Sequence, residues 1–450
     1  MQQIDEKIAS GEGLVRAIGR WSIAALTINC IIGSGVFGLP SILAALLGRA
    51  SSLAVLLAAL AIAVVMACFA EVASRFANTG GPYLYAHAAF GRFMGIQVAW
   101  LMWVVRVTSC AANANLFVTY LAQFWPGATT THVNLTILTI LIGVLALINI
   151  RGVRAGTRVS SSFTIAKLSS LIIVAVAGGF WLLLKHPAPG NNSIALGTTQ
   201  WTHAIVLLIF AYGGFEAALI SAGEATDPRR DLPFGLFAAL LTCAAIYGIL
   251  QWVVVGILPD PAHSDRPLAD VARILMGNAG ASLTAIGALL SIYGYLSANM
   301  LTMPRITFAL AERGDFPSVF ACLHPRFKTP WFSILVFAAI VWILAFFGSF
   351  AGNATLSAGS RLFYYGVVCA ALPVLRRRHA SSPSRFQLPA GTVFAVLGVL
   401  ICLGLFAQIE YTKALILLAA VAVAFLNWLA VRHRSPFSGQ FENPKIRGDC

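Results

Sequence analysis

Charged residues are scarce in this sequence. Only 10% of its 450 residues are Asp, Glu, Lys or Arg, whereas 59% are hydrophobic, and a soluble domain has about 25% charged residues. Long polar stretches are missing as well, so there is no room for a soluble domain of useful size. The composition excludes an ordinary soluble protein and predicts an integral membrane protein that lies in a lipid bilayer.

Acidic residues are scarcer than basic ones, with 16 Asp and Glu against 30 Lys and Arg and a net charge of +14. Such an excess also occurs in proteins that bind nucleic acid, so its distribution matters. If the N-terminus is inside, most of the Lys and Arg residues fall in the cytoplasmic segments, which is the positive-inside pattern. We therefore expect no nucleic-acid partner, but a multi-pass protein of the cytoplasmic (inner) membrane with both termini in the cytoplasm.

Metal-ligand spacing is absent among the eight cysteines, and no constellation of catalytic nucleophiles stands out. The sequence thus predicts no metal, no cofactor and no enzymatic activity.

Apolar runs are abundant. A helix of about 20 apolar residues crosses a hydrocarbon core of about 30 Å, and twelve such runs are found. They fall near residues 21–46, 52–74, 93–124, 133–150, 160–184, 201–222, 233–258, 279–303, 331–350, 360–375, 390–409 and 412–431. This pattern predicts an all-α polytopic membrane protein with twelve transmembrane helices.

The first apolar run is interrupted by Gly33, Ser34, Gly35, Gly38 and Pro40. Gly costs about 1 kcal/mol against Ala inside a helix, and Pro removes a backbone donor. The helix should therefore break here. Because unsatisfied backbone groups are expensive in lipid, an irregular segment survives only where it is buried in protein or lines a cavity.

A second interruption lies in the sixth run, at Gly213 and Gly214, with Glu216 close behind. Breaks in helices one and six are the pattern of an inverted repeat whose broken helices meet near the middle of the membrane. Helix N-termini suit a carboxylate, and helix C-terminal carbonyls suit an ammonium group. A site with both ends fits a zwitterion such as an amino acid.

Two other interpretations of these glycines were weighed. Gly33-x-Gly35-x-x-Gly38 fits the dinucleotide fingerprint, but that motif requires a soluble βαβ unit and here lies inside a membrane span. Close helix packing of the small-xxx-small kind remains open as a structural alternative.

Several motifs resemble those of the amino acid-polyamine-organocation (APC) superfamily, in particular its L-type amino acid transporters and the bacterial arginine/agmatine antiporter. They form four groups, namely GSGVF at 33–37, FAYGG at 210–214, GEATDPRRDLP at 223–233, and PR at 304–305 together with AERGDFP at 311–317. Four such groups in order on twelve spans make the resemblance specific, and it covers roughly residues 15–378.

The resemblance implies a LeuT-type fold, with two inverted five-helix repeats, two extra helices, and helices one and six unwound at the midplane. The domains would be a cytoplasmic segment 1–20, repeats 21–184 and 201–378, helices eleven and twelve over 390–431, and a cytoplasmic tail 432–450. It also implies a substrate site formed by Ile31, Gly33, Ser34, Gly35 and Val36 on the carboxylate side and by Phe210, Ala211 and Gly213 on the amino side, with the Phe210 ring as a gate.

Charged residues inside spans are functional candidates, since their burial is expensive. The resemblance places Glu216 where the arginine/agmatine antiporter has a glutamate linked to protons; capping of the broken helix and contact with a cationic substrate are the alternatives. It implies that Lys167 replaces a sodium ion beside the first break, against the alternative that its side chain snorkels to the interface.

Two arginines complete the set of charged residues in the spans. Arg106 departs from the superfamily pattern, and we expect it either to pair with Glu216 or to face an anionic group of the substrate. Arg361 is expected near the outer mouth of the tenth span, in a structural role.

These expectations combine into a sodium-independent secondary transporter of amino acids, acting by alternating access as a proton-coupled symporter or an amino acid exchanger. An amine or polyamine transporter of the same fold and an amino acid-binding sensor are the alternatives. The loop after the third span has no cysteine, so we expect no disulfide-linked heavy chain, and a protein that works alone or as a homodimer.

Overall fold

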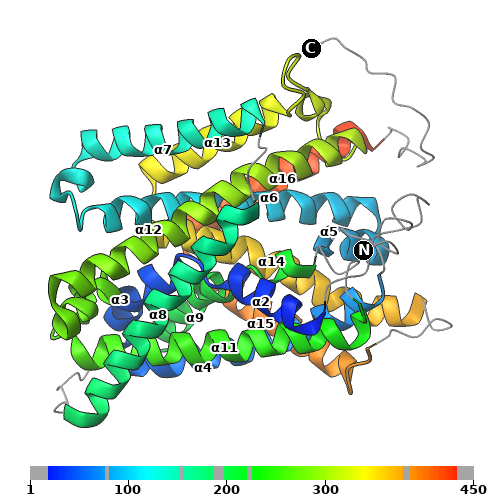
Figure 1. Ribbon diagram of the computed structural model, residues 1–450. Coiled ribbons are helices and arrows are strands. Elements are labelled where there is room, and N and C mark those ends of the chain that lie inside the picture. The colour runs from blue at the N-terminus through cyan, green and yellow to red at the C-terminus, as the bar shows by residue number, and fades with distance from the viewer. Residues whose placement is uncertain are drawn as a thin grey trace, which may run out of the picture.

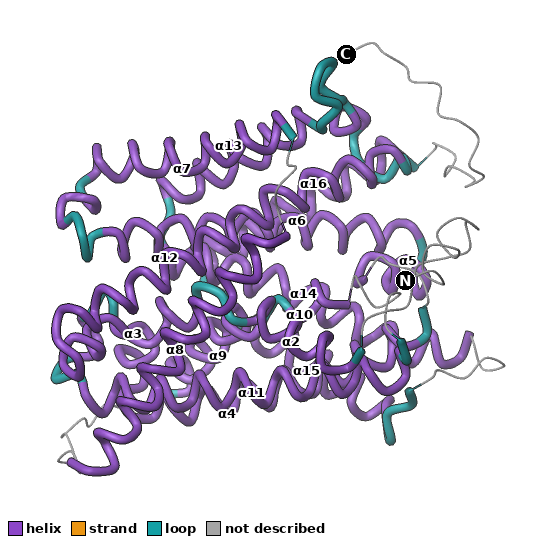
Figure 2. Tube along the Cα trace, viewed as in Figure 1, coloured by secondary structure: helices purple, strands orange, loops and turns teal. Residues whose placement is uncertain are grey.

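The computed structural model describes residues 19–76, 81–152, 157–185, 197–219, 226–378 and 386–432. Every regular element in these ranges is a helix (Figures 1 and 2). The α-helices are α2 (Arg20–Ile31), α3 (Gly35–Leu47), α4 (Ser51–Ser74), α5 (Gly81–Phe90), α6 (Arg92–Leu121), α7 (Thr131–Arg151), α8 (Thr157–Lys185), α9 (Thr198–Tyr212), α10 (Phe215–Ala218), α11 (Pro228–Ile257), α12 (Pro267–Glu312), α13 (Trp331–Phe347), α14 (Phe350–Arg378), α15 (Gly391–Phe406) and α16 (Tyr411–Val431). Short 3₁₀ turns lie at Gly48–Ala50, Pro126–Thr129, Pro261–His263 and Ser318–Ala321.

The predicted fold class, an all-α polytopic membrane protein, is confirmed. Nine stretches of the described residues are long and apolar enough to cross a membrane, while α13 and α15 are shorter apolar helices. One of the nine, Gly35–Ser74, joins α3 and α4. The count of twelve spans and the division into repeats therefore stay predictions. Most of the expected terminal segments 1–20 and 432–450, and part of the 223–233 motif, lie outside the described residues.

The long helices lie side by side, with α7 and α13 together along one side of the bundle (Figure 1). Helix α14 packs against α6, α9, α15 and α4, whereas α11 packs against α2, α4 and α8. Because α14 contacts both α6 and α9, it brings its side chains to the level of the second helix break.

The first and sixth apolar runs are both broken. Helix α2 ends at Ile31, and α3 begins only at Gly35. Helix α9 ends at Tyr212, and the short α10 begins after Gly214, whose φ of 117° lies in the left-handed region that favours glycine. The glycines therefore interrupt the helices where the sequence predicts it.

The tenth apolar run is longer than the sequence predicts, because α14 begins at Phe350 and not near residue 360. Its first part contains Gly352, Asn353, Thr355, Ser357 and Gly359, whose small or polar side chains weaken the hydrophobic pattern. They are tolerated because this part of the helix is mostly buried in protein, with Asn353, Thr355 and Ser357 each about 2% exposed or less. This shift places Arg361 well inside the helix.

Candidate functional site

The two helix breaks lie against each other. A Cβ atom added at Gly35 would stand 2.9 Å from Ala211 Cα, and one added at Gly214 would collide with the Cys30 carbonyl. A Cβ at Gly33 would meet nothing closer than 3.9 Å. The packing interpretation therefore applies to Gly35 and Gly214, which bring the breaks into contact, while Gly33 has room for a methyl group.

Opposite helix ends meet at this contact. The first N–H groups of a helix have no partner within it, so Gly35 and Val36 present donors at the start of α3. The Ser34 hydroxyl is buried beside them and has no hydrogen-bond partner among the described residues. At the end of α9, the Ala211 carbonyl accepts a hydrogen bond from the Tyr247 hydroxyl at 3.3 Å, and the same hydroxyl lies 3.2 Å from the Ile31 carbonyl. Tyr247 thus bridges the two breaks.

A small cavity separates the helix ends. Its volume is about 20 Å³, which is room for about one water molecule, so the site is contracted and must widen to admit an amino acid. Seven of the residues that the resemblance assigns to the substrate line it, namely Ile31, Gly33, Ser34, Gly35, Phe210, Ala211 and Gly213; Val36 is not part of the lining. The rest of the lining comes from Cys30, Ser109, Asn113, Gly214, Tyr295 and Arg361.

Lys167 lies behind the first break. Its ammonium group donates to the carbonyl oxygens of Asn29 at 2.9 Å and Ile32 at 2.7 Å, and the residue is only 6% exposed. Carbonyls at the end of α2 are the groups that a cation there would bind. The side chain points inward to these acceptors. It does not extend to the membrane interface, which was the alternative expectation.

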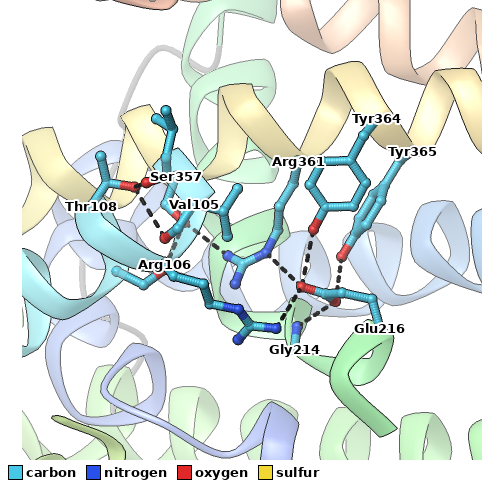
Figure 3. Close-up of polar contacts among 11 residues, drawn as sticks. Val105, Arg106, Thr108, Gly214, Glu216, Ser357, Arg361, Tyr364 and Tyr365 are labelled. Atoms are coloured by element: carbon cyan, nitrogen blue, oxygen red, sulfur yellow. Dashed lines mark hydrogen bonds and ion pairs between the residues drawn. The ribbon is translucent and has the colours of Figure 1, made fainter. Parts of the chain in front are cut away.

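Glu216 is surrounded by donors (Figure 3). One oxygen accepts from the Tyr364 hydroxyl at 3.0 Å and lies 3.5 Å from Arg361 Nε and 3.7 Å from Arg106 Nη2. The other accepts from the Tyr365 hydroxyl at 3.1 Å and from the Gly214 N–H at 2.9 Å. The carboxylate therefore caps the second break and also pairs with two arginines. We call Glu216, Arg106 and Arg361 the central cluster.

The expected place of Arg361, near the outer mouth of the tenth span, was wrong. The residue is 2% exposed and lines the cavity between the two helix breaks. Its Nη1 donates to Ser357 at 3.1 Å, and its guanidinium lies 5.8 Å from the centre of the Phe210 ring. The error follows from the late start predicted for the tenth span, which placed Arg361 at a helix end.

Phe210 lies at the edge of the cavity, 7% exposed, in edge-to-face contact with Phe350 at 6.0 Å. Held between Phe350 and the Arg361 guanidinium, the ring is in a position to cover a ligand, as a gate requires.

The sequence did not predict a role for Ser109, Asn113, Tyr295, Tyr364 or Tyr365. The two tyrosines follow Arg361 by three and four residues, so they share its helix face, and this spacing was readable once Arg361 was placed in the interior. Ser109 and Asn113 likewise follow Arg106 by three and seven residues. Tyr295 carries no local signal, because only tertiary packing brings α12 to the cavity.

A multi-pass helical membrane protein whose two broken helices face a buried polar cavity is the class that this geometry defines. The family model described as amino acid permease matches residues 18–430. The chain therefore belongs to the amino acid permease family, within the APC superfamily that its motifs resemble.

Three relatives from Bacillus subtilis (strain 168) are similar over nearly their whole length. The chain is 25% identical to a methylthioribose transporter, over 94% of this chain and 93% of the relative. It is 26% identical to the branched-chain amino acid permease BcaP, over 96% and 95%. It is 27% identical to the serine/threonine exchanger SteT, over 86% and 89%. These names point to a transporter rather than an enzyme.

Proposed function

We propose that this chain moves amino acids across the cytoplasmic membrane as a sodium-independent secondary transporter that works by alternating access. One observation carries the proposal: the start of α3 and the end of α9 face the same buried cavity. Free N–H groups attract a carboxylate, and free carbonyls attract an ammonium group. An amino acid has both charges on neighbouring atoms, and family membership supports the same substrate class.

Sodium independence rests on Lys167. Its ammonium group already binds the Asn29 and Ile32 carbonyls, so a second cation at the end of α2 would be repelled. Replacement of bath sodium by choline should leave the initial uptake rate unchanged. A rate that follows the sodium concentration would contradict this role.

Exchange is favoured over proton symport by the surroundings of Glu216. The groups within hydrogen-bond distance of its oxygens are donors, namely the Tyr364 and Tyr365 hydroxyls, the Gly214 N–H and the guanidinium of Arg361. A protonated carboxyl group would leave Arg361 and Arg106 without the negative charge that they face. We therefore assign Glu216 to holding α10 and α14 at the cavity, and expect exchange to continue without a pH gradient.

The test is uptake of labelled amino acids into proteoliposomes that contain the purified protein. Gly35→Ala should lower uptake about tenfold or more, since overpacking of about 1–3 kcal/mol pushes the breaks apart. Gly404→Ala, in α15 and outside the cavity lining, should stay near the parent rate because nothing lies within 4 Å of the added methyl group. Equal loss in both variants, with folding intact, would contradict the site.

The same assay separates the two alternatives. An amine transporter would accumulate a labelled diamine such as putrescine, which has no carboxylate for the α3 terminus. A sensor would bind amino acids in a thermal-shift assay, yet would show neither accumulation nor exchange.

A further inference from the structure

The charges around the cavity are unbalanced. Among the described residues, the buried ionic groups near the two helix breaks are Arg106, Lys167, Glu216 and Arg361. Lys167 is satisfied by backbone carbonyls. In the central cluster, two guanidinium groups then share a single carboxylate, which leaves one positive charge without an anion.

The two ion pairs in this cluster are also long. Arg361 Nε and Arg106 Nη2 lie 3.5 Å and 3.7 Å from the same Glu216 oxygen, whereas a charge-assisted N–H···O bond measures about 2.7–2.9 Å. Tyr364 and Tyr365 already donate to the two carboxylate oxygens. Glu216 thus holds both arginines near the cavity without using up their donors.

Arg361 has a donor left for a ligand. Its Nη1 binds Ser357 and its Nε faces Glu216 (Figure 3), while Nη2 has no hydrogen-bond partner among the described residues. The residue is 2% exposed and lines the cavity. Because Arg361 lines the cavity, this donor is available to a ligand that has an acceptor at that point.

We propose that the preferred substrate is an amino acid with a second carboxylate, of the aspartate or glutamate kind, and that Arg361 receives the side-chain carboxylate with Arg106 in support. This inference rests on the proposed function, and it names the substrate class of that same site. The start of α3 takes the α-carboxylate and the end of α9 takes the amino group. Arg361, on the third helix α14, lies beside Gly213 and the Phe210 ring, where a side-chain carboxylate can reach it.

The charge balance supports this choice over other amino acids. A zwitterion with a neutral side chain brings no net charge, so the excess guanidinium stays uncompensated. A cationic amino acid adds a further positive charge next to Arg361 and Phe210, where the guanidinium already covers the ring. Only a net anion neutralises the cluster.

The first test compares isosteres. Binding of L-aspartate and of L-asparagine to the purified full-length protein is measured by thermal shift and titration, because these ligands differ by one charge and hardly in size. We expect aspartate to bind at least about tenfold more tightly, as a charge-assisted contact to a guanidinium would give. Asparagine binding as tightly as aspartate would overturn the inference.

A variant tests the role of Arg361 directly. The variant Arg361→Gln removes the excess positive charge and leaves Arg106 paired with Glu216, so no new unpaired charge is buried. It should lose the preference for aspartate over asparagine. The matched control is Arg273→Gln, at a partly exposed arginine of α12 that pairs with Asp270 outside the cavity, and it should keep the parent ratio. An Arg361→Gln variant that keeps the preference would overturn the inference; if it does not fold, the comparison of isosteres in the parent protein still decides.

The outcomes also separate this inference from the proposed function. If neutral amino acids are taken up and aspartate is not, the transporter proposal stands and the substrate class is wrong. If no amino acid binds or is moved, the proposed function fails first. Succinate, which has two carboxylates and no amino group, should bind at least about tenfold less well than aspartate; equal binding would refute the amino half of the site.

Discussion

Two buried carboxylates in this protein each meet two arginines, yet their surroundings differ. Glu71, on α4, is 0% exposed and forms what we call the helix-end cluster with Arg75 and Arg376. Arg376 grips it with two bonds, at 2.8 Å and 2.6 Å, while Arg75 lies at 3.0 Å. The Leu388 N–H adds a fourth donor at 2.9 Å. The central cluster has no arginine contact shorter than 3.5 Å.

The difference separates a structural ion pair from a site that can change partners. In the helix-end cluster, two nitrogens of the Arg376 guanidinium bind the two oxygens of Glu71 in a bidentate pair. Arg376 Nη2 also donates to the Leu388 carbonyl at 2.8 Å. That cluster joins α4, α14 and the segment before α15. In the central cluster the arginines are held near Glu216 and keep donors for a ligand.

The largest expected effect comes from breaking the helix-end cluster. Glu71→Ala leaves Arg75 and Arg376 without their anion and should lower the free energy of unfolding by about 3–5 kcal/mol, the usual loss when one partner of a buried pair is removed. Thermal melting of the purified protein measures it. Substrate preference among the molecules that still fold should not change. A melting temperature equal to that of the parent protein would show that the helix-end cluster does not stabilise the folded state.

A smaller effect is expected when one arginine of each cluster is replaced by lysine, and the two variants can be compared directly. Arg376→Lys loses the planar fork but keeps the charge, so it should lower stability by about 1–2 kcal/mol and leave the ratio of aspartate to asparagine affinity as it was. Arg361→Lys should change that ratio severalfold with a smaller change in melting, since its contacts to Glu216 are already long. The comparison fails if both variants alter the same property.

Much of this arrangement was predictable from local chemistry. The two breaks follow from glycines inside apolar runs, and pairing of Arg106 with Glu216 was one of two stated expectations. Lys167 donates to carbonyls at the end of α2, beside the first break, where the resemblance placed it; its replacement of a sodium ion stays a prediction. These predictions succeed because each rests on a group too expensive to leave unsatisfied in a membrane.

Arg361 and the bridging tyrosines could not be predicted in the same way. A hydropathy pattern assumes that a span faces lipid, but the first part of α14 faces protein, so small polar residues replace long apolar ones there. The pattern then starts the helix about ten residues late. Tyr247 and Tyr295 reach the breaks from α11 and α12, and only the packing of helices far apart in the sequence puts them there.

The smallest effect on stability is expected at a third carboxylate, which is exposed to solvent. Glu410, between α15 and α16, is bonded to Lys413 at 2.7 Å and lies 3.9 Å from His203, with 49% of its side chain exposed. The hydrogen bond from Lys413 lowers the pKa of Glu410. A lowered pKa in the folded state gives stability that is present above the unfolded value, about 4.3, and lost as the pH falls through the folded value.

Because water screens this pair, its contribution should be below about 1 kcal/mol. Lys413→Met should therefore melt slightly below the parent protein at pH 6, and the gap should close as the pH falls below the lowered pKa of Glu410 in the folded parent protein. Melting curves across that range measure it. A stability difference of several kcal/mol between the two proteins, or one that widens in acid, would contradict this prediction. It would mean that solvent exposure does not make the Glu410 pair weaker than the buried pairs of Glu71.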